Sequence, residues 1–163
     1  MIRHTVRALC AASLVIAPLA LSTPAHAATA CTVNGMPRPD GDVNGTPGDD
    51  YIRCSSVDPE DTVDGLGGAD TFVLTGPVGG TVAGGLGRDY FEVTSSGSVS
   101  GVLGGGPDAD YFALTGPVTA GGQVYGDTGN DYFRVAANGG FIDAGPGTDV
   151  CRVTGNPPVN CEF

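Results

Sequence analysis

A repeat of about 20 residues is the feature that most constrains what this chain can fold into. Each of six stretches has glycines, then an aspartate, then alternating apolar residues, as in GGLGRDYFEV at 84–93. Aligned on the aspartate, the copies are spaced by 20, 19, 21, 21 and 18 residues and cover about residues 40–154. A regular period of this size indicates a solenoid, in which each repeat buries its apolar side against its neighbours. The aligned aspartates are Asp50, Asp70, Asp89, Asp110, Asp131 and Asp149.

Three apolar columns accompany the aspartates and predict two strands in every repeat. Apolar residues stand two and four positions after each aspartate, which is the alternation of a half-buried strand, and a third column stands seven positions before it. We therefore expect an all-β, right-handed parallel β-roll or β-helix solenoid of about six coils, closed by disulfides at its ends. The expected core residues are Ile52, Phe72, Phe91, Phe112, Phe133 and Cys151, then Cys54, Leu74, Val93, Leu114, Val135 and Val153, and finally Val43, Val63, Val82, Leu103, Val124 and Ile142.

The first 27 residues have the layout of a secretory signal peptide. Arg3 and Arg7 precede an apolar run over 8–21, and Ala25-His26-Ala27 supplies the small residues of a cleavage site. The run is too short for a stable membrane-spanning helix. We therefore expect a secreted, extracellular protein with no membrane insertion after signal cleavage. The remaining parts are an amino-terminal cap at 28–44, the repeat body at 45–154 and a carboxy-terminal cap at 155–163.

The charge of the mature chain excludes some partners and favours others. No lysine occurs, and cleavage after Ala27 would remove both histidines and two arginines. Five arginines then face 18 carboxylates, which gives a net charge of −13. Nucleic acid and anionic membranes are poor partners for such a surface, whereas divalent cations are suitable ones.

The cysteines predict two disulfides. Cys10 belongs to the leader, and four cysteines in an exported chain allow three pairings. Because the four lie in two groups near the ends of the repeat body, we favour Cys31–Cys54 and Cys151–Cys161. A zinc site is disfavoured, since the spacing lacks CxxC and no histidine remains.

The glycine loop before each aspartate admits three interpretations. A tight turn alone needs only glycines with positive φ and an aspartate that accepts bonds from nearby amides. A phosphate loop opens a helix and usually carries a lysine, whereas here a strand follows and lysine is absent. Calcium takes six to eight oxygen ligands, both carboxylates and carbonyls, and stacked loops would supply both. Calcium would also relieve the repulsion among stacked aspartates, so we predict calcium ions between adjacent loops.

The loop also resembles a known repeat. The nonapeptide G-G-x-G-x-D-x-U-x of RTX, or haemolysin-type, calcium-binding repeat proteins, with U large and apolar, matches Gly84 to Glu92 at every defined position. The resemblance implies a parallel β-roll whose calcium ligands are the motif aspartates and the glycine-loop carbonyls. The motif occupies only one half-turn of each coil in this chain. Calcium is therefore expected on one side, with at most about five sites for six loops.

The motif, carried over position by position, gives the expected metal ligands. They are the six aligned aspartates and the first and third glycines of each loop. In the fourth copy Asp108 stands at the third glycine and adds a ligand or distorts the loop, and in the last copy Ala144 replaces the first glycine. The glycines are Gly45, Gly65, Gly84, Gly105 and Gly126 at the first position, and Gly48, Gly68, Gly87, Gly129 and Gly147 at the third.

The outward faces leave other functions open. An outward tyrosine column (Tyr51, Tyr90, Tyr111 and Tyr132) is either a sugar- or partner-binding ladder or a set of rings stacked between strands. A threonine column could order water on ice, and a calcium-dependent polysaccharide-active enzyme is the catalytic alternative. Without histidine or lysine the commonest catalytic bases are absent. We therefore expect no enzyme but an extracellular calcium-binding protein with a structural or adhesive role, in which calcium drives folding and a cell-surface or polysaccharide partner is unidentified.

Overall fold

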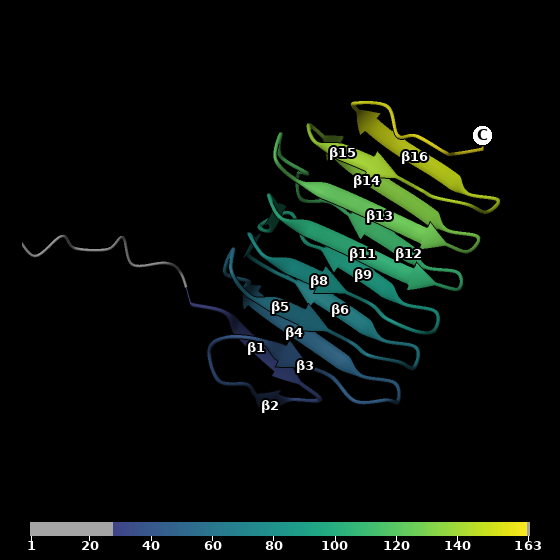
Figure 1. Cartoon of the computed structure of the whole chain (residues 1–163). Helices are drawn as coiled ribbons and strands as arrows, with labels where there is room; N and C mark the ends of the chain where they lie inside the picture. Colours follow the sequence, from purple (N-terminus) through teal and green to yellow (C-terminus); the bar gives the residue numbers. More distant parts are fainter. Residues whose placement is uncertain (1–27, 163) are drawn as a thin grey trace, which may run out of the picture.

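The computed structural model describes residues 28–162, and the predicted signal peptide lies outside them. Within this part every regular element is a β-strand, and successive strands wind into a parallel solenoid of six coils (Figure 1). The predicted fold class, an all-β parallel solenoid with a coil of about 20 residues, is confirmed. No helix in residues 28–162 is long and apolar enough to cross a membrane.

The strands that follow the glycine loops form an eight-stranded sheet. In spatial order they are β16 (Val150–Gly155), β14 (Tyr132–Asn138), β12 (Tyr111–Leu114), β9 (Tyr90–Val93), β6 (Thr71–Leu74), β4 (Tyr51–Ser56), β1 (Ala30–Val33) and β2 (Met36–Pro37). From β4 to β16 the neighbours are parallel and in register, so that Phe72 lies beside Phe91 and Phe91 beside Phe112. At the amino-terminal end β1 pairs antiparallel with both β4 and β2.

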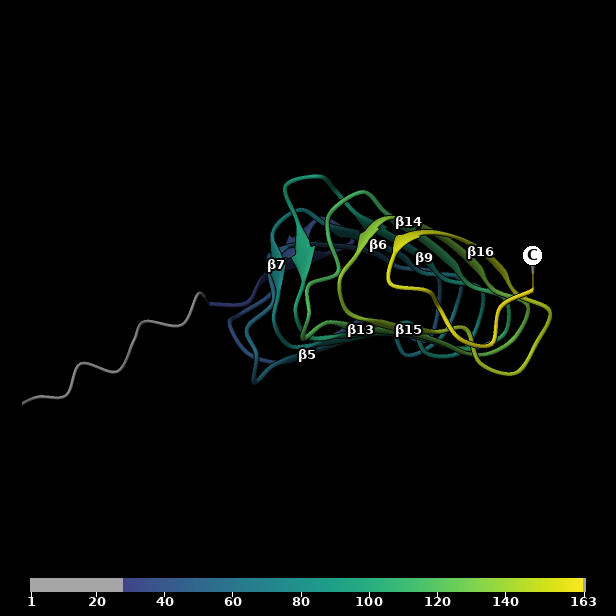
Figure 2. The ribbon, with the colours of Figure 1, turned by 90° about the horizontal axis from the view of Figure 1, so that it is seen from above.

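The strands that precede the loops form a six-stranded parallel sheet on the opposite side of the core (Figure 2). They are β15 (Phe141–Asp143), β13 (Gln123–Thr128), β11 (Val102–Pro107), β8 (Thr81–Ala83), β5 (Thr62–Asp64) and β3 (Val43–Asn44). In each of these strands the apolar residue predicted to face inward is buried. Both predicted strands of the repeat are therefore present.

A third, narrow side closes each coil at the edge away from the glycine loops, where the sequence predicted only a turn. β7 (Pro77–Val78) and β10 (Ser98–Val99) pair in parallel there (Figure 2). Isolated parallel bridges extend the column from Val57 to Val78 and from Val99 through Val118 to Asn138. All five of these side chains are buried. The turn is therefore long enough to add an inward-facing position to each coil, and the cross-section has three sides.

Stacked phenylalanines form the centre of the core. The rings of Phe72, Phe91, Phe112 and Phe133 lie 4.6–4.8 Å apart, within 5° of parallel, and all are fully buried. This spacing equals the distance between hydrogen-bonded strands, because each ring occupies the same position in successive coils. The register of the whole eight-stranded sheet is thereby fixed.

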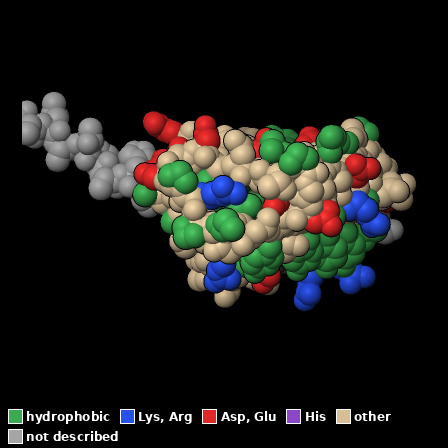
Figure 3. Space-filling view, turned by 90° about the horizontal axis from the view of Figure 1, so that it is seen from below, with side chains coloured by type: hydrophobic (Ala, Val, Ile, Leu, Met, Phe, Trp, Pro, Cys, Tyr) green, Lys and Arg blue, Asp and Glu red, His purple; other side chains and the backbone are tan. Residues whose placement is uncertain are grey.

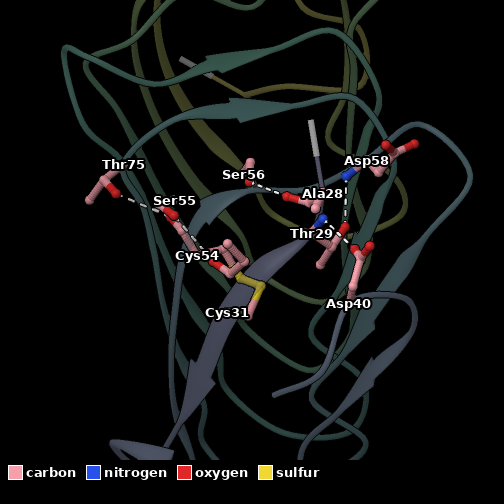
Figure 4. Close-up of a disulfide and its surroundings, with 10 residues drawn as sticks. Ala28, Thr29, Cys31, Asp40, Cys54, Ser55, Ser56, Asp58 and Thr75 are labelled. Carbon is pink, nitrogen blue, oxygen red and sulfur yellow. Dashed lines mark hydrogen bonds between the residues drawn. A yellow bond between two sulfur atoms is a disulfide. The ribbon is translucent and has the colours of Figure 1, made fainter. Parts of the chain in front are cut away.

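Disulfides close both ends of the solenoid. Cys31 in β1 bonds to Cys54 in β4, which fastens the amino-terminal hairpin over the first coil (Figure 4). Cys151 bonds to Cys161, and the tail pairs with the last coil through bridges from Val159 to Asp143 and from Glu162 to Val150. The pairing expected from the grouping of the cysteines is confirmed, and at the carboxy-terminal end the tail covers the edge strands β15 and β16.

Candidate metal centre

The six aligned aspartates stand at one edge of the solenoid, each at the end of its glycine loop. Each precedes a strand of the eight-stranded sheet by one residue, so the in-register pairing of those strands stacks the carboxylates in a column. All six are buried, with at most 4% of the residue exposed. Carboxylates are rarely buried to this degree without a compensating partner.

One oxygen of each carboxylate has such a partner. The amide N–H of Asp70 donates to Oδ1 of Asp89 at 2.8 Å, and the other neighbouring pairs repeat this bond at 2.7–2.8 Å. The result is a ladder of amide-to-carboxylate bonds along the solenoid axis, which joins every coil to the next.

Residues outside the repeat terminate the ladder at both ends. At the amino-terminal end Asn34 donates its side-chain amide to Oδ1 of Asp50 and accepts the N–H of Tyr51. At the carboxy-terminal end Oε2 of Glu162 accepts the N–H of Asp149, and thus takes the place of a seventh aspartate. Sequence reasoning missed both residues, because neither belongs to the repeat. Their only signal is proximity to the cap cysteines Cys31 and Cys161.

The second oxygen of the carboxylates has no hydrogen-bond partner in five of the six copies. The buried Oδ2 atoms concerned are those of Asp70, Asp89, Asp110, Asp131 and Asp149. In the first copy the N–H of Thr46 donates to Oδ2 of Asp50. A buried oxygen of an ionised carboxylate that has no hydrogen-bond donor destabilises the fold by about 1–3 kcal/mol or more. These atoms therefore require either a proton or a cation.

A backbone carbonyl from the next coil lies close to four of these oxygens, those of Asp70, Asp89, Asp110 and Asp131. A Cβ atom at Gly84 would overlap both Oδ2 of Asp89 and the carbonyl oxygen of Gly105, and Gly65 and Gly126 have equivalent surroundings. At Gly84 these two oxygens lie 2.2 and 2.6 Å from the Cβ position, so they are less than about 5 Å apart, which is the largest separation of two ligands of one calcium ion. Glycine is therefore required at these positions, because a side chain would overlap both oxygens.

Not all six loops are equivalent. An unpartnered Oδ2 faces the carbonyl of the next loop, across a first glycine, at Asp70, Asp89, Asp110 and Asp131. In the last copy the buried methyl group of Ala144 stands where the other loops have hydrogen. With Asp50 satisfied by Thr46, four of the five gaps between neighbouring loops have this arrangement of oxygens.

The third glycines pack differently from the first. A Cβ at Gly87 would overlap the carbonyl of Gly68, and one at Gly129 the carbonyl of Asp108. Gly68, Gly87 and Gly129 also have positive φ values, of 115°, 117° and 158°. The structure therefore places these glycines against the backbone of the preceding loop and not beside an unpartnered Oδ2. Gly48 has open space around it, and Gly147 lies against the carbonyl of Gly129.

Asp108 occupies the third-glycine position of the fourth copy with a φ of 85°. It is exposed, so its carboxylate does not join the buried column. Its charge nevertheless acts on the column, because it helps to raise the pKa of both Asp89 and Asp110. Asp108 therefore has a positive φ, as three of the glycines at this position do, and adds negative charge beside the fourth loop.

Burial sets the protonation of the column in the metal-free protein. It raises the pKa of Asp70, Asp89 and Asp131 to about 6 and that of Asp110 to about 8. Hydrogen bonds from the neighbouring amides oppose this shift, and adjacent carboxylates add to it. Desolvation raises the pKa of Asp149 as well. Without a cation these five carboxyl groups therefore keep their protons to a higher pH than an ordinary aspartate does.

The donor set is rich in backbone oxygen. No group of three histidine, cysteine, aspartate or glutamate side chains converges on one point within residues 28–162. Each space between loops instead has an aspartate oxygen and peptide carbonyls. Such a mixture suits a hard cation with many oxygen ligands, such as calcium, and does not suit zinc.

The outward tyrosine and threonine columns make contacts within the fold. The rings of Tyr90, Tyr111 and Tyr132 stack at 5.4 and 4.8 Å. The hydroxyl groups of Thr75 and Thr115 donate to carbonyls of the preceding coil. Stacking between neighbouring strands accounts for the tyrosine column, and these threonine hydroxyls are engaged in the fold, which disfavours an ordered-water surface.

No protein-family model matches the chain, and no curated protein or solved structure matches it significantly. The molecule itself is a disulfide-closed parallel β-solenoid of six coils with a buried aspartate ladder at one edge, an architecture consistent with a β-roll. Its two disulfides are typical of proteins that mature in an oxidising environment.

Proposed function

We propose that this protein is an extracellular, non-enzymatic calcium-binding repeat protein of the RTX type, which holds calcium ions between successive loops of the aspartate edge. The observation that carries the proposal is the row of buried Oδ2 atoms without a donor, four of which lie close to a carbonyl of the next loop. The match of 84–92 to the nonapeptide supports the same assignment. Calcium would supply positive charge to oxygens that lack a donor.

The residues of each site have distinct parts in this proposal. The aspartate holds its own coil to its neighbour through Oδ1 and offers Oδ2 to the cation. The first glycine has no Cβ and so lets the aspartate oxygen and the carbonyl of the next loop approach one another, and both oxygens would contact the ion. The sites are bounded by residues 65–70, 84–89, 105–110 and 126–131 and the loop that follows each. A bound ion would thus link two coils, so binding and stacking are coupled.

Calcium binding fits the expected location of the protein. The amino-terminal leader and the two disulfides support export. Extracellular calcium modules bind with dissociation constants of about 10⁻⁴–10⁻³ M. Sites of this affinity would be empty inside a cell and filled outside, so the chain would complete its folding after export. We propose a structural or adhesive role for the folded solenoid, with no catalytic activity.

Calorimetric titration of the refolded, disulfide-intact chain with calcium tests the proposal, together with far-ultraviolet circular dichroism. We expect about four calcium ions per chain and a gain of β signal, with magnesium much weaker. Asp110→Asn should lose about one ion. Glu92→Gln makes the same change of charge on an outward strand position and should keep all of them.

The outcome that contradicts the proposal is specific. Absence of binding heat at millimolar calcium, with unchanged dichroism, would leave the aspartates as a purely structural ladder. Equal losses of calcium in Asp110→Asn and Glu92→Gln would show that calcium follows net charge and not the loop sites.

A further inference from the structure

Two arginines lie side by side at the carboxy-terminal end of the eight-stranded sheet. Arg134 of β14 and Arg152 of β16 are register partners on parallel strands, so their side chains leave the same face about 4.8 Å apart. Both are exposed. Like charges directly opposite on neighbouring strands are destabilising. A fold with 18 carboxylates could place an acid beside them, yet it does not.

Neither arginine forms an ion pair in the described part of the chain. The register partner of Arg134 on its other side is Ala113, and Glu92 lies one strand further away. Arg152 lies over the ring of Tyr132, with its guanidinium carbon 5.8 Å from the ring centre. The pair thus keeps its charge available on one face of an otherwise acidic molecule.

The arginines border a groove. A hollow of about 340 Å³ is lined by Ala113, Thr115, Ala136 and Thr154 together with the two arginines. Small alanines form its apolar floor, and hydroxyl and guanidinium groups stand at its rim. Figure 3 shows basic side chains at the edge of a continuous apolar area on one side of the molecule. The volume is in the range of small-ligand sites.

Charge and shape together indicate the ligand class. Two adjacent guanidinium groups suit the two oxygens of one carboxylate. A polyanion such as nucleic acid would be repelled by the net charge of −13, whereas a ligand with isolated carboxylates would not be opposed as strongly. The apolar floor beside hydroxyl groups suits the mixed apolar and hydroxylated faces of a sugar ring.

We propose that the groove between Arg134 and Arg152 binds a carboxylate-bearing sugar residue of an acidic saccharide. The arginines hold the carboxylate, Thr154 bonds to a ring hydroxyl, and Ala113 and Ala136 contact the ring. This inference does not rest on calcium binding, because none of its residues belongs to the aspartate edge.

Titration of the ¹⁵N-labelled chain with trigalacturonate, followed by nuclear magnetic resonance, tests the proposal at fixed calcium and again without calcium. The expected dissociation constant is about 1 mM, with shifts confined to residues 113–115, 134–136 and 152–154. Arg134→Gln and Arg152→Gln should each weaken binding at least about tenfold. Arg53→Gln changes the same strand position in the first coil, where the neighbour is Val73, and should stay within about twofold.

Four comparison ligands test which chemical class the groove binds. The methyl ester of trigalacturonate lacks the carboxylates and should not bind. Equal binding of the ester, or an equal loss in Arg53→Gln, would overturn the proposal. Stronger binding of a sulfated disaccharide, a single-stranded oligonucleotide or a peptide carboxyl terminus would also overturn it, since each replaces the carboxylate sugar by another class. Unchanged circular dichroism of each variant establishes that folding is intact.

Discussion

The two edges of each coil solve the same packing problem with opposite chemistry. At the edge away from the glycine loops, hydroxyl groups such as those of Thr75, Ser100 and Thr119 donate to carbonyls of the preceding coil. These stacked hydroxyl groups are uncharged and have their acceptors within the fold. At the aspartate edge the stacked groups are acceptors, and in five of the six coils one oxygen has no donor. The comparison teaches that stacking alone stabilises one edge, whereas the other requires a proton or a cation.

Calcium should therefore act on one edge only, and this is the largest expected effect. A site with a dissociation constant of about 10⁻³ M adds about 1.4 kcal/mol at 10 mM calcium, and four sites add about 6 kcal/mol. Urea unfolding with 10 mM calcium and with a chelator measures the difference. An equal free energy of unfolding under both conditions would mean that the aspartate edge is complete without metal.

Protonation of the buried aspartates at low pH should stabilise the metal-free protein and so replace calcium in part. The folded-state pKa values of about 6 for Asp70, Asp89 and Asp131 and about 8 for Asp110 lie above the ordinary value of 3.8. Between about pH 4 and pH 8 the metal-free folded chain binds more protons than the unfolded chain, so its stability falls as the pH rises through this range.

The free energy of unfolding in chelator should fall by about 3 kcal/mol between pH 5 and pH 8, after allowance for solvent screening. Thermal unfolding in chelator at pH 5 and pH 8 measures it. Saturating calcium should reduce the difference, because the ion takes the place of the proton. A melting temperature that rises with pH in chelator would contradict the assignment of the raised pKa values.

The effect of Asp110→Asn on stability should change sign when calcium is present. Without metal and above pH 8, where Asp110 is ionised, the amide can donate to the Gly126 carbonyl beside it and removes a buried charge, so stability rises by about 1–2 kcal/mol. With calcium the variant loses one site and about 1.4 kcal/mol. Thr115→Val is the matched change at the other edge, and should cost about 1 kcal/mol in both conditions. Denaturant unfolding of both variants, with and without calcium, tests the inversion.

Leu66→Gly has the smallest expected effect. Leu66 stands at the second position of its loop with a φ of 75°, where Gly85, Gly106 and Gly145 also have positive φ. Glycine there relieves the left-handed conformation, and stability should rise by about 0.5 kcal/mol after the greater freedom of the unfolded chain is counted. Leu86→Gly, at an exposed loop position without positive φ, should give no gain in the same measurement.

Periodicity made most of the fold predictable. The phenylalanine column, the two flanking apolar columns and both disulfides follow from spacing, because a stacked repeat places every copy of a position in one environment. The side formed by Val57, Val78, Val99 and Val118 was not predicted. Its strands have only two residues, and its glycine- and proline-rich surroundings are also typical of a turn.

The residues of the candidate site could be predicted from the sequence, but the differences between its six loops could not. The aspartates and first glycines follow from the motif. Two features distinguish the first and last loops from the others: the hydrogen bond from the Thr46 amide to Asp50 and the methyl group of Ala144. Both depend on where atoms lie within a loop. Asn34 and Glu162 could not be predicted for a related reason, since a terminating residue differs by necessity from the copies that it ends.

The two terminating residues have a consequence for how long such a molecule can be. Asn34 and Glu162 close the first and last rungs from the disulfide-bonded caps, and every interior coil meets only another coil. The body is therefore modular: duplication of one 20-residue segment would lengthen it by about 4.8 Å and leave both ends unchanged. In such a design the number of gene-encoded copies, and not the chemistry of the ends, determines the reach of the molecule and its capacity for ions.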